Sequence, residues 1–141
     1  MGDKLTVNVR SFSYKKGIPQ DESGNGGGFV FDCRGILNPG RIQEYKTITG
    51  RDKGVIEYLE TKTKILEFLH AIYTIVDLTI EDYSARGFAN LEINFGCTGG
   101  QHRSVYWADA VAKHIQEKFP DVKVVVNHVE QESKNWINET Y

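Results

Sequence analysis

Four short stretches of the chain predict β-strands: hydrophobic and polar residues alternate in the first and third, and apolar residues predominate in the second and fourth. These stretches are residues 5–10, 29–31, 91–95 and 122–126. Apolar residues recur at helical spacing in 55–84 and 104–119, and the charged residues 60–64 divide the first of these segments into two helices. The order strand, strand, helix, helix, strand, helix, strand predicts an α/β fold with a small mixed sheet and flanking helices.

Two long connections lack a regular pattern. The first, residues 11–28, ends in the glycine-rich run 22–28, where we expect a surface loop. The second, residues 35–54, contains the turn sequence Asn38-Pro39-Gly40. Irregular connections of this length in a compact domain are often functional, so the second segment is a candidate part of a site.

Length and charge narrow the class of protein. The 141 residues suit one domain, at 1–141, with a core at about 5–130 and a tail at 131–141. A net charge of −2 gives no general attraction to nucleic acid or to an anionic membrane. No apolar run approaches the ~20 residues that span a bilayer, and the N-terminus lacks the apolar segment of a secretory signal. We therefore expect a cytoplasmic protein without a membrane partner.

The two cysteines, Cys33 and Cys97, are expected to be reduced thiols in that compartment. They lack the spacing of metal ligands. Neither a metal nor a cofactor is expected.

The sequence FGCTGGQHRS at 95–104 carries the clearest chemical signal. It lies between the third predicted strand and the last long helix, where glycines leave main-chain N–H groups without helical partners. These N–H groups and the helix dipole favour an anion such as phosphate, and an arginine adds a fixed cation. The residues expected to bind phosphate are Thr98, Gly99, Gly100, Gln101, His102, Arg103 and Ser104.

The same loop is similar in spacing to the Cys-x-x-Gly-x-x-Arg-Ser motif of the cysteine-dependent phosphatases. In such a site Cys97 would attack phosphorus while Arg103 held the phosphate oxygens. Gly96 stands where those enzymes carry histidine, and no acid is clearly placed to protonate the leaving group. Cys97 also suits a second interpretation, a small buried apolar residue at a strand end. We expect a non-catalytic binding or sensor domain for a phosphorylated small molecule, either a phosphosugar or a nucleotide phosphate, with the phosphatase as the alternative.

Further segments extend a resemblance over about 5–130. They are SFSYKKGIP at 11–19, FDCR at 31–34, LNP at 37–39, TGRD at 49–52 and His128. With the loop they resemble the RapZ C-terminal domain of RNase adapter proteins. The resemblance implies a fold like a phosphofructokinase subdomain and a pocket for a phosphosugar such as glucosamine-6-phosphate. It also implies binding of a small regulatory RNA and self-association into a homo-oligomer.

The resemblance adds Asp32, Arg34, Asn38 and Lys15 as pocket or basic positions. Relatives usually carry an N-terminal Walker-type nucleotide-binding domain, so this chain is expected to be a free-standing C-terminal module. Asp32 and Arg34 have two interpretations that stay open: both converge on the phosphate loop, or they form a structural pair that braces loop ends.

Three departures from the family are visible in the sequence. Gly40 replaces a frequent histidine, and the run 22–28 lengthens a loop. The segment 128–134 is acidic on balance where relatives end in basic residues, which weakens the expectation of RNA binding.

Of Tyr106 and Trp107, one is expected in the core and the other in a self-association contact.

Overall fold

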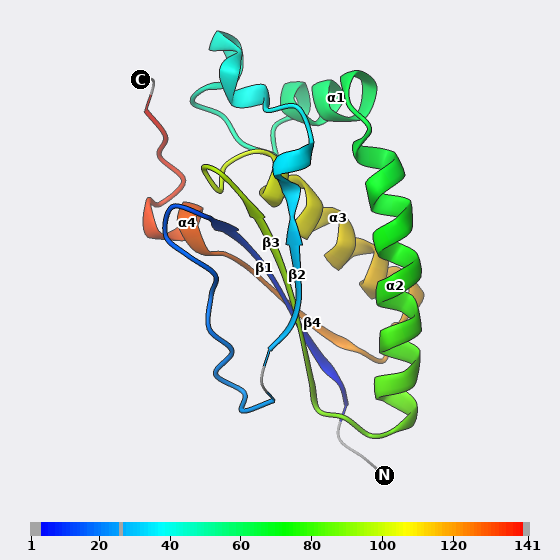
Figure 1. Ribbon diagram of the computed structural model, residues 1–141. Helices are drawn as coiled ribbons and strands as arrows, with labels where there is room; N and C mark the ends of the chain where they lie inside the picture. The colour runs from blue at the N-terminus through cyan, green and yellow to red at the C-terminus, as the bar shows by residue number, and fades with distance from the viewer. Residues whose placement is uncertain (1–3, 26, 140–141) are drawn as a thin grey trace.

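Four parallel strands form the central sheet in the order β2-β3-β1-β4 (Figure 1). The computed structural model describes residues 4–25 and 27–139. The strands are β1 (Thr6–Ser13), β2 (Gly28–Asp32), β3 (Asn90–Cys97) and β4 (Lys123–His128). The helices are α1 (Lys53–Lys62), α2 (Ile65–Ala85), α3 (Arg103–Lys118) and α4 (Val129–Ser133), with 3₁₀ turns η1 (Cys33–Gly35), η2 (Pro39–Arg41) and η3 (Gln43–Tyr45).

The predicted α/β class is confirmed, but the sheet is parallel at each described pairing rather than mixed. Every connection between successive strands is long enough to return to the same end of the sheet, which parallel pairing requires. The last two strands in the chain, β3 and β4, have the same direction and are separated in the sheet by β1.

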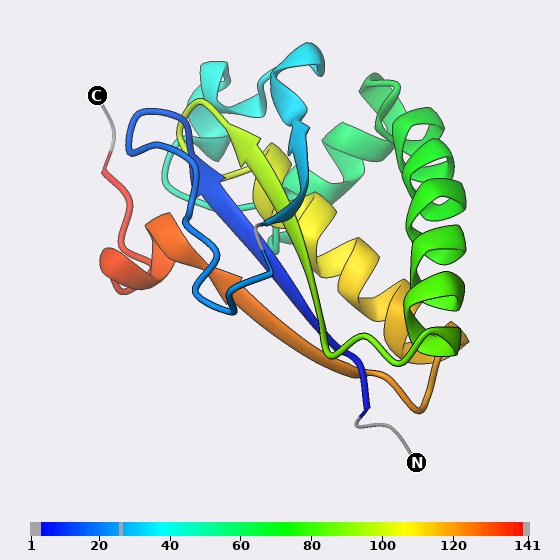
Figure 2. The same cartoon turned by 60° about the horizontal axis from the view of Figure 1, so that its bottom comes forward.

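The two faces of the sheet differ in polarity. On one face, the buried Val9 and Ile93 and the partly buried Val126 align across three strands. The helices α2 and α3 lie on this face (Figure 2). On the other face, Asn8 donates to Asn90 over 2.6 Å. This alternation of apolar and polar positions produced the strand pattern in the sequence.

The break between α1 and α2 falls in the charged segment, as predicted. The Thr63 hydroxyl donates to the carbonyl of Leu59 and accepts from the N–H of Ile65 at 3.2 Å. This side chain therefore takes the place of the main-chain bonds that would otherwise continue the helix.

The carboxyl ends of all four strands meet at one edge of the sheet, the upper edge in Figure 1. The turns η1–η3, the loop 98–102 and α4 gather there. Ligands of open α/β sheets bind at this edge. Among the described helices, none combines the length and apolar character needed to cross a membrane.

Candidate functional site

The loop between β3 and α3 presents main-chain N–H groups without partners. In the described part of the chain, the N–H groups of residues 98–104 donate to no other protein group. The loop turns at Gly100, whose φ is +64° and where a Cβ would lie 2.9 Å from the N atom of Ser13. Glycine is needed at this turn, and the free donors are those that an oxyanion binds.

A hollow of about 250 Å³ opens beside these N–H groups, and we call it the loop hollow. Its walls include Thr98 and Gly99 of the loop. Four cationic side chains also line it: Lys15, Arg41, Lys46 and Arg103. Neither Asp nor Glu lines it within residues 4–25 and 27–139. The field in this hollow favours an anion.

Arg103 is 5% exposed and is committed in part to the protein itself. Its Nη1 donates to the carbonyl of Ile36 at 2.7 Å and to that of Arg34 at 3.3 Å. Its Nε is buried and has no hydrogen-bond partner among the described atoms. The guanidinium thus braces the η1 segment on one side while its charge stays at the wall of the hollow.

Gln101 and His102 also brace the irregular connection. The Gln101 amide donates to the carbonyls of Lys46 (2.7 Å) and Ile48 (2.8 Å). The His102 Nε2 lies 2.7 Å from the carbonyl of Tyr45. Burial lowers the pKa of His102 below 6.5, so the ring is neutral at pH 7 and Nε2 is its donor. The other ring nitrogen, Nδ1, is then an acceptor and suits a phosphate dianion poorly.

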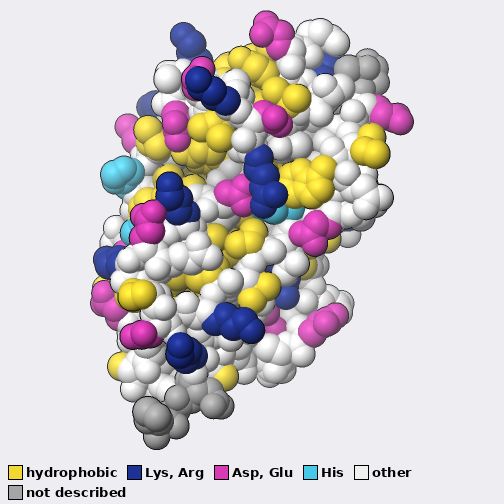
Figure 3. Space-filling view, turned by 180° about the vertical axis from the view of Figure 1, so that it is seen from behind, with side chains coloured by type: hydrophobic (Ala, Val, Ile, Leu, Met, Phe, Trp, Pro, Cys, Tyr) yellow, Lys and Arg dark blue, Asp and Glu magenta, His cyan; other side chains and the backbone are white. Residues whose placement is uncertain are grey.

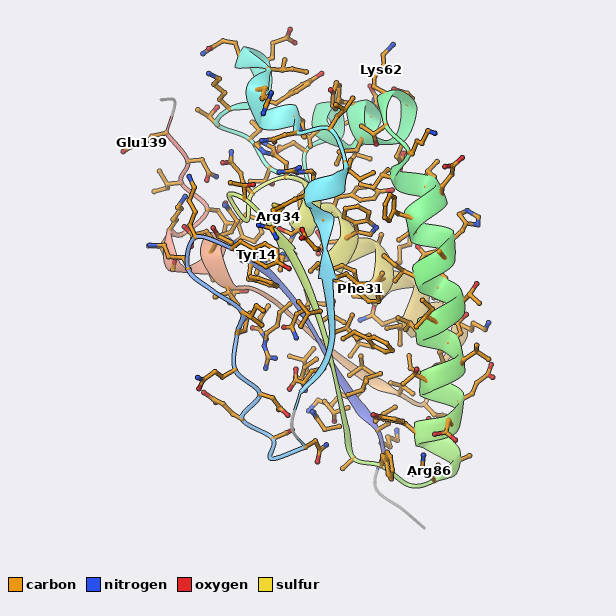
Figure 4. All side chains as sticks on the ribbon, in the orientation of Figure 1. Tyr14, Phe31, Arg34, Lys62, Arg86 and Glu139 are labelled. Carbon is orange, nitrogen blue, oxygen red and sulfur yellow. The ribbon has the colours of Figure 1, made fainter. Side chains whose placement is uncertain are left out.

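Asp32 and Arg34 form a bidentate ion pair outside the loop hollow. The Arg34 Nε and Nη2 lie 2.8 and 2.6 Å from the Asp32 carboxylate oxygens, and these bonds hold the pKa of Asp32 below its usual value. The guanidinium also lies 3.9 Å over the Tyr14 ring (Figure 4). Both side chains of the pair are about half exposed. In this structure Asp32 holds Arg34 in place.

The remaining predicted residues divide between the hollow and the interior. Lys15 is exposed at the rim, and Asn38 lines the hollow while its Oδ1 accepts from the N–H of Gly40 at 2.9 Å. Gly100 and Ser104 are buried and do not line it.

Sequence reasoning missed two cations of the loop hollow, Arg41 and Lys46. Both lie in the irregular connection that was expected to contribute to a site. The Arg41 guanidinium makes no side-chain hydrogen bond or ion pair with the described residues. The available signal was the presence of basic residues in a long irregular connection, a kind of segment that is often functional.

Cys97 also lines the loop hollow, although it is 2% exposed. Its Sγ lies 3.1 Å from the Ser104 Oγ. At the preceding position, Gly96, a Cβ would lie 2.4 Å from the Phe12 ring and 2.6 Å from the Tyr14 ring. No side chain fits there, which explains why this chain lacks the histidine of the cysteine phosphatases.

A second polar cluster lies at the same edge, and its Asp109 is partly exposed to solvent. Ser11 Oγ lies 2.6 Å from His128 Nδ1, and His128 Nε2 lies 2.8 Å from Asp109. Ser11 and His128 are both buried. His128 also packs against Trp136, whose ring lies 4.5 Å below the Arg51 guanidinium. The cluster attaches the C-terminal segment to the sheet.

Neither Tyr106 nor Trp107 is available for self-association. Both are buried, and the Tyr106 hydroxyl donates to Glu60 at 2.7 Å. The expectation of a contact residue at this pair was wrong, because α3 is covered by α1 and α2 on the side where these rings lie. No three His, Cys, Asp or Glu side chains are grouped as metal ligands in the residues described.

Comparison with known proteins identifies the family of this chain. The sequence profile of the RapZ C-terminal domain matches residues 5–132. A nucleotide-binding protein of Xylella fastidiosa (strain 9a5c) is 38% identical over 116 residues, which are 82% of this chain and 38% of that protein. One from Ruegeria pomeroyi is 36% identical over 133 residues, 94% of this chain and 44% of that protein.

This chain spans less than half the length of these relatives. The profile nevertheless covers nearly all of it, from the first strand through α4. The chain belongs to the RapZ C-terminal domain family.

Proposed function

We propose that this protein binds a phosphorylated small molecule, with the phosphate in the loop hollow, and that it does so without catalysis. The observation that carries the proposal is the set of unpartnered N–H groups at 98–104 beside four cationic side chains. The buried Nε of Arg103, which lacks a partner in the described structure, supports it independently. A bound anion would accept hydrogen bonds from these donors.

The relatives are named nucleotide-binding proteins, which supports a phosphorylated ligand. Two ligand classes agree with the proposal, a phosphosugar such as glucosamine-6-phosphate and a nucleotide. In both, the phosphate would accept hydrogen bonds from the N–H groups of Thr98 and Gly99, and Lys15 and Arg41 would neutralise its charge.

A matched pair of variants at Gly99 tests the phosphate site. A Cβ at Gly99 meets no atom within 4 Å, so both Gly99→Asp and Gly99→Asn fit without displacing the fold. The two side chains have nearly the same shape, but only Asp adds a negative charge. We expect Gly99→Asp to weaken binding of inorganic phosphate about tenfold or more in calorimetry, and Gly99→Asn by less than about threefold. Equal binding by the wild type and both variants would contradict the site.

A cysteine-dependent phosphatase using Cys97 and Arg103 is the second candidate. The 3.1 Å contact of the Cys97 Sγ with Ser104, at the wall of the loop hollow, favours it. The ion pair of Asp32 with Arg34 opposes it, as does the lack of a carboxylate among the described residues that line the loop hollow, because the leaving group would need an acid. Hydrolysis of p-nitrophenyl phosphate that disappears in Cys97→Ser would establish the activity, and no turnover between pH 5 and 8 would exclude it.

An RNA-adapter role and self-association follow from the family and have less support from the surface. On the face shown in Figure 3, basic and acidic side chains are interspersed and form no single positive field. A salt-dependent gel shift with a structured RNA tests the role. Sedimentation of the intact chain tests self-association.

A further inference from the structure

The two cysteines of the chain lie at the ends of neighbouring strands. The strands β2 and β3 are paired in register up to the residue that precedes each cysteine. Two positions before the cysteines, Phe31 and Phe95 are paired, and their rings stack at 5.4 Å between centroids. Because the side chains of a strand alternate between the two faces of a sheet, Cys33 and Cys97 follow these rings on the same face.

The contacts of the two thiols agree with this placement. Both side chains belong to the buried core cluster, and both thiols are free. The Cys33 Sγ lies 3.6 Å from the Phe31 carbonyl oxygen and hydrogen-bonds with the main chain of Gly96, the residue directly before Cys97. Burial, and then the charge of a thiolate at Cys97, raise the pKa of Cys33 well above its usual value.

The spacing of paired strands suits a bond between the two sulfurs. Adjacent strands place their Cα atoms about 4.8 Å apart, within the roughly 4.4–6.8 Å that a disulfide spans. The turn η1, which begins at Cys33, packs against β3, which ends at Cys97. Closing the bond therefore needs a local shift of side chains and no rearrangement of the sheet.

The two thiols differ in their access to small molecules. Cys97 is a wall residue of the loop hollow, whereas Cys33 does not line it. The hollow has a volume of about 250 Å³, enough for a molecule the size of hydrogen peroxide. A peroxide that enters from solvent therefore reaches Cys97 first, and Cys33 lies beside it in the interior.

We propose that Cys33 and Cys97 are a redox pair, which closes into a reversible disulfide when the protein meets hydrogen peroxide. The Cys97 thiolate attacks one peroxide oxygen, the O–O bond breaks and hydroxide leaves, so that Cys97 becomes a sulfenic acid. The Cys33 thiolate then attacks the Cys97 sulfur, the S–O bond breaks and a second hydroxide leaves. The two protons released by the thiols convert both hydroxides to water.

The modification site is distinct from the proposed phosphate site but adjoins it. Cys97 directly precedes Thr98, the first residue of the loop 98–104. The disulfide would join this position to the start of η1. The inference concerns the thiols alone, so it stands or falls independently of phosphate binding.

Mass spectrometry of the intact, folded chain tests the redox pair. The protein is exposed to hydrogen peroxide until free glutathione in a parallel sample is oxidised, and it is then quenched in acid, alkylated and digested. We expect a peptide that crosslinks Cys33 to Cys97, in a protein that runs as a single chain on a non-reducing gel. Dithiothreitol should remove the crosslink. Two thiols that stay reduced, oxidise separately to sulfinic acids or crosslink only between chains would overturn the proposal.

The variants Cys33→Ala and Cys97→Ala test the order of the two steps, and urea denaturation checks that each variant is folded. In Cys33→Ala, we expect Cys97 to stop at the sulfenic acid, which a cyclic 1,3-diketone traps. In Cys97→Ala, the thiol of Cys33 should be lost at least about tenfold more slowly, because it does not line the hollow. Equal rates in the two variants would show that Cys97 is not the first thiol to react. The crosslink in the wild type needs no variant, so it decides the existence of the pair in any case.

Discussion

The loop 98–104 is a single sequence motif, but its two halves have different surroundings in the structure. Thr98 and Gly99 face the loop hollow with free N–H groups. Gln101, His102 and Arg103 are buried, and their side chains bind carbonyls of the connection between β2 and α1. The first half offers its free N–H groups to a ligand. The second half also lines the hollow, but its side chains hold together the segment that forms the opposite wall. Neighbouring residues of one motif thus have different roles: some offer hydrogen bonds to a ligand, and others hold the connection between β2 and α1 in place.

This division has a structural reason. The regular elements of the connection 33–52 are 3₁₀ turns of three residues, and the few hydrogen bonds inside these turns do not attach the segment to the rest of the domain. Three consecutive side chains of the loop supply those bonds at different points of the connection. Changes in the braced half should therefore lower stability and affinity together, and changes in the open half should lower affinity alone.

The largest loss of stability is expected from Gly50→Ala, which separates the connection 33–52 from residues 101–103 of the loop. The Gly50 N–H donates to the Gln101 carbonyl at 3.0 Å, and a Cβ there would lie 2.2 Å from the His102 carbonyl oxygen. The clash is with main chain, so we expect a loss of roughly 2–4 kcal/mol in the free energy of unfolding. Urea denaturation measures it. Gly99→Ala is the control, with a change below about 0.5 kcal/mol.

Arg103→Leu should cause the next largest loss of stability. It leaves the buried carbonyl of Ile36 without its 2.7 Å donor, a loss of about 2 kcal/mol by urea denaturation. Because the charge is also removed, binding of inorganic phosphate should weaken several-fold. A variant with unchanged stability and weakened binding would show that the guanidinium does not brace η1.

His102 should make stability depend on pH. Burial lowers its folded-state pKa below 6.5, so the unfolded chain takes up a proton more readily. The stabilisation is complete above pH 6.5 and is lost as the pH falls below that value. We expect the wild type to lose more stability than His102→Gln between pH 7 and pH 5, measured by urea denaturation at each pH. If the wild type and His102→Gln lose the same stability between pH 7 and pH 5, His102 does not cause this pH dependence.

The smallest effect on stability is expected at the open half. Lys15 is exposed at the rim of the loop hollow, so Lys15→Gln should change the free energy of unfolding by less than about 0.5 kcal/mol. The same variant should weaken phosphate binding about threefold. Lys16→Gln, at the next exposed position and outside the hollow, is the control.

Much of the fold was predictable because its signals are local. The apolar alternation of 5–10 and 91–95 located β1 and β3, and the helical spacing after Ser104 located α3. Strand direction was not predictable for β2, whose three apolar residues lack a pattern that distinguishes parallel from antiparallel neighbours. The cations Arg41 and Lys46 were missed because an irregular connection has no period from which to place its side chains.

The sequence by itself determined the α/β architecture in outline, the family, and a glycine turn rich in free N–H groups, since periodicity and backbone freedom are properties of neighbouring residues. Only the tertiary structure decided which side chains of the loop 98–104 remain available to a ligand. Gln101, His102 and Arg103 find partners 53 to 69 residues away in the chain, at carbonyls that a sequence pattern does not mark. A side chain's chemistry is visible in the sequence, but its hydrogen-bond partner depends on which distant main chain folds against it.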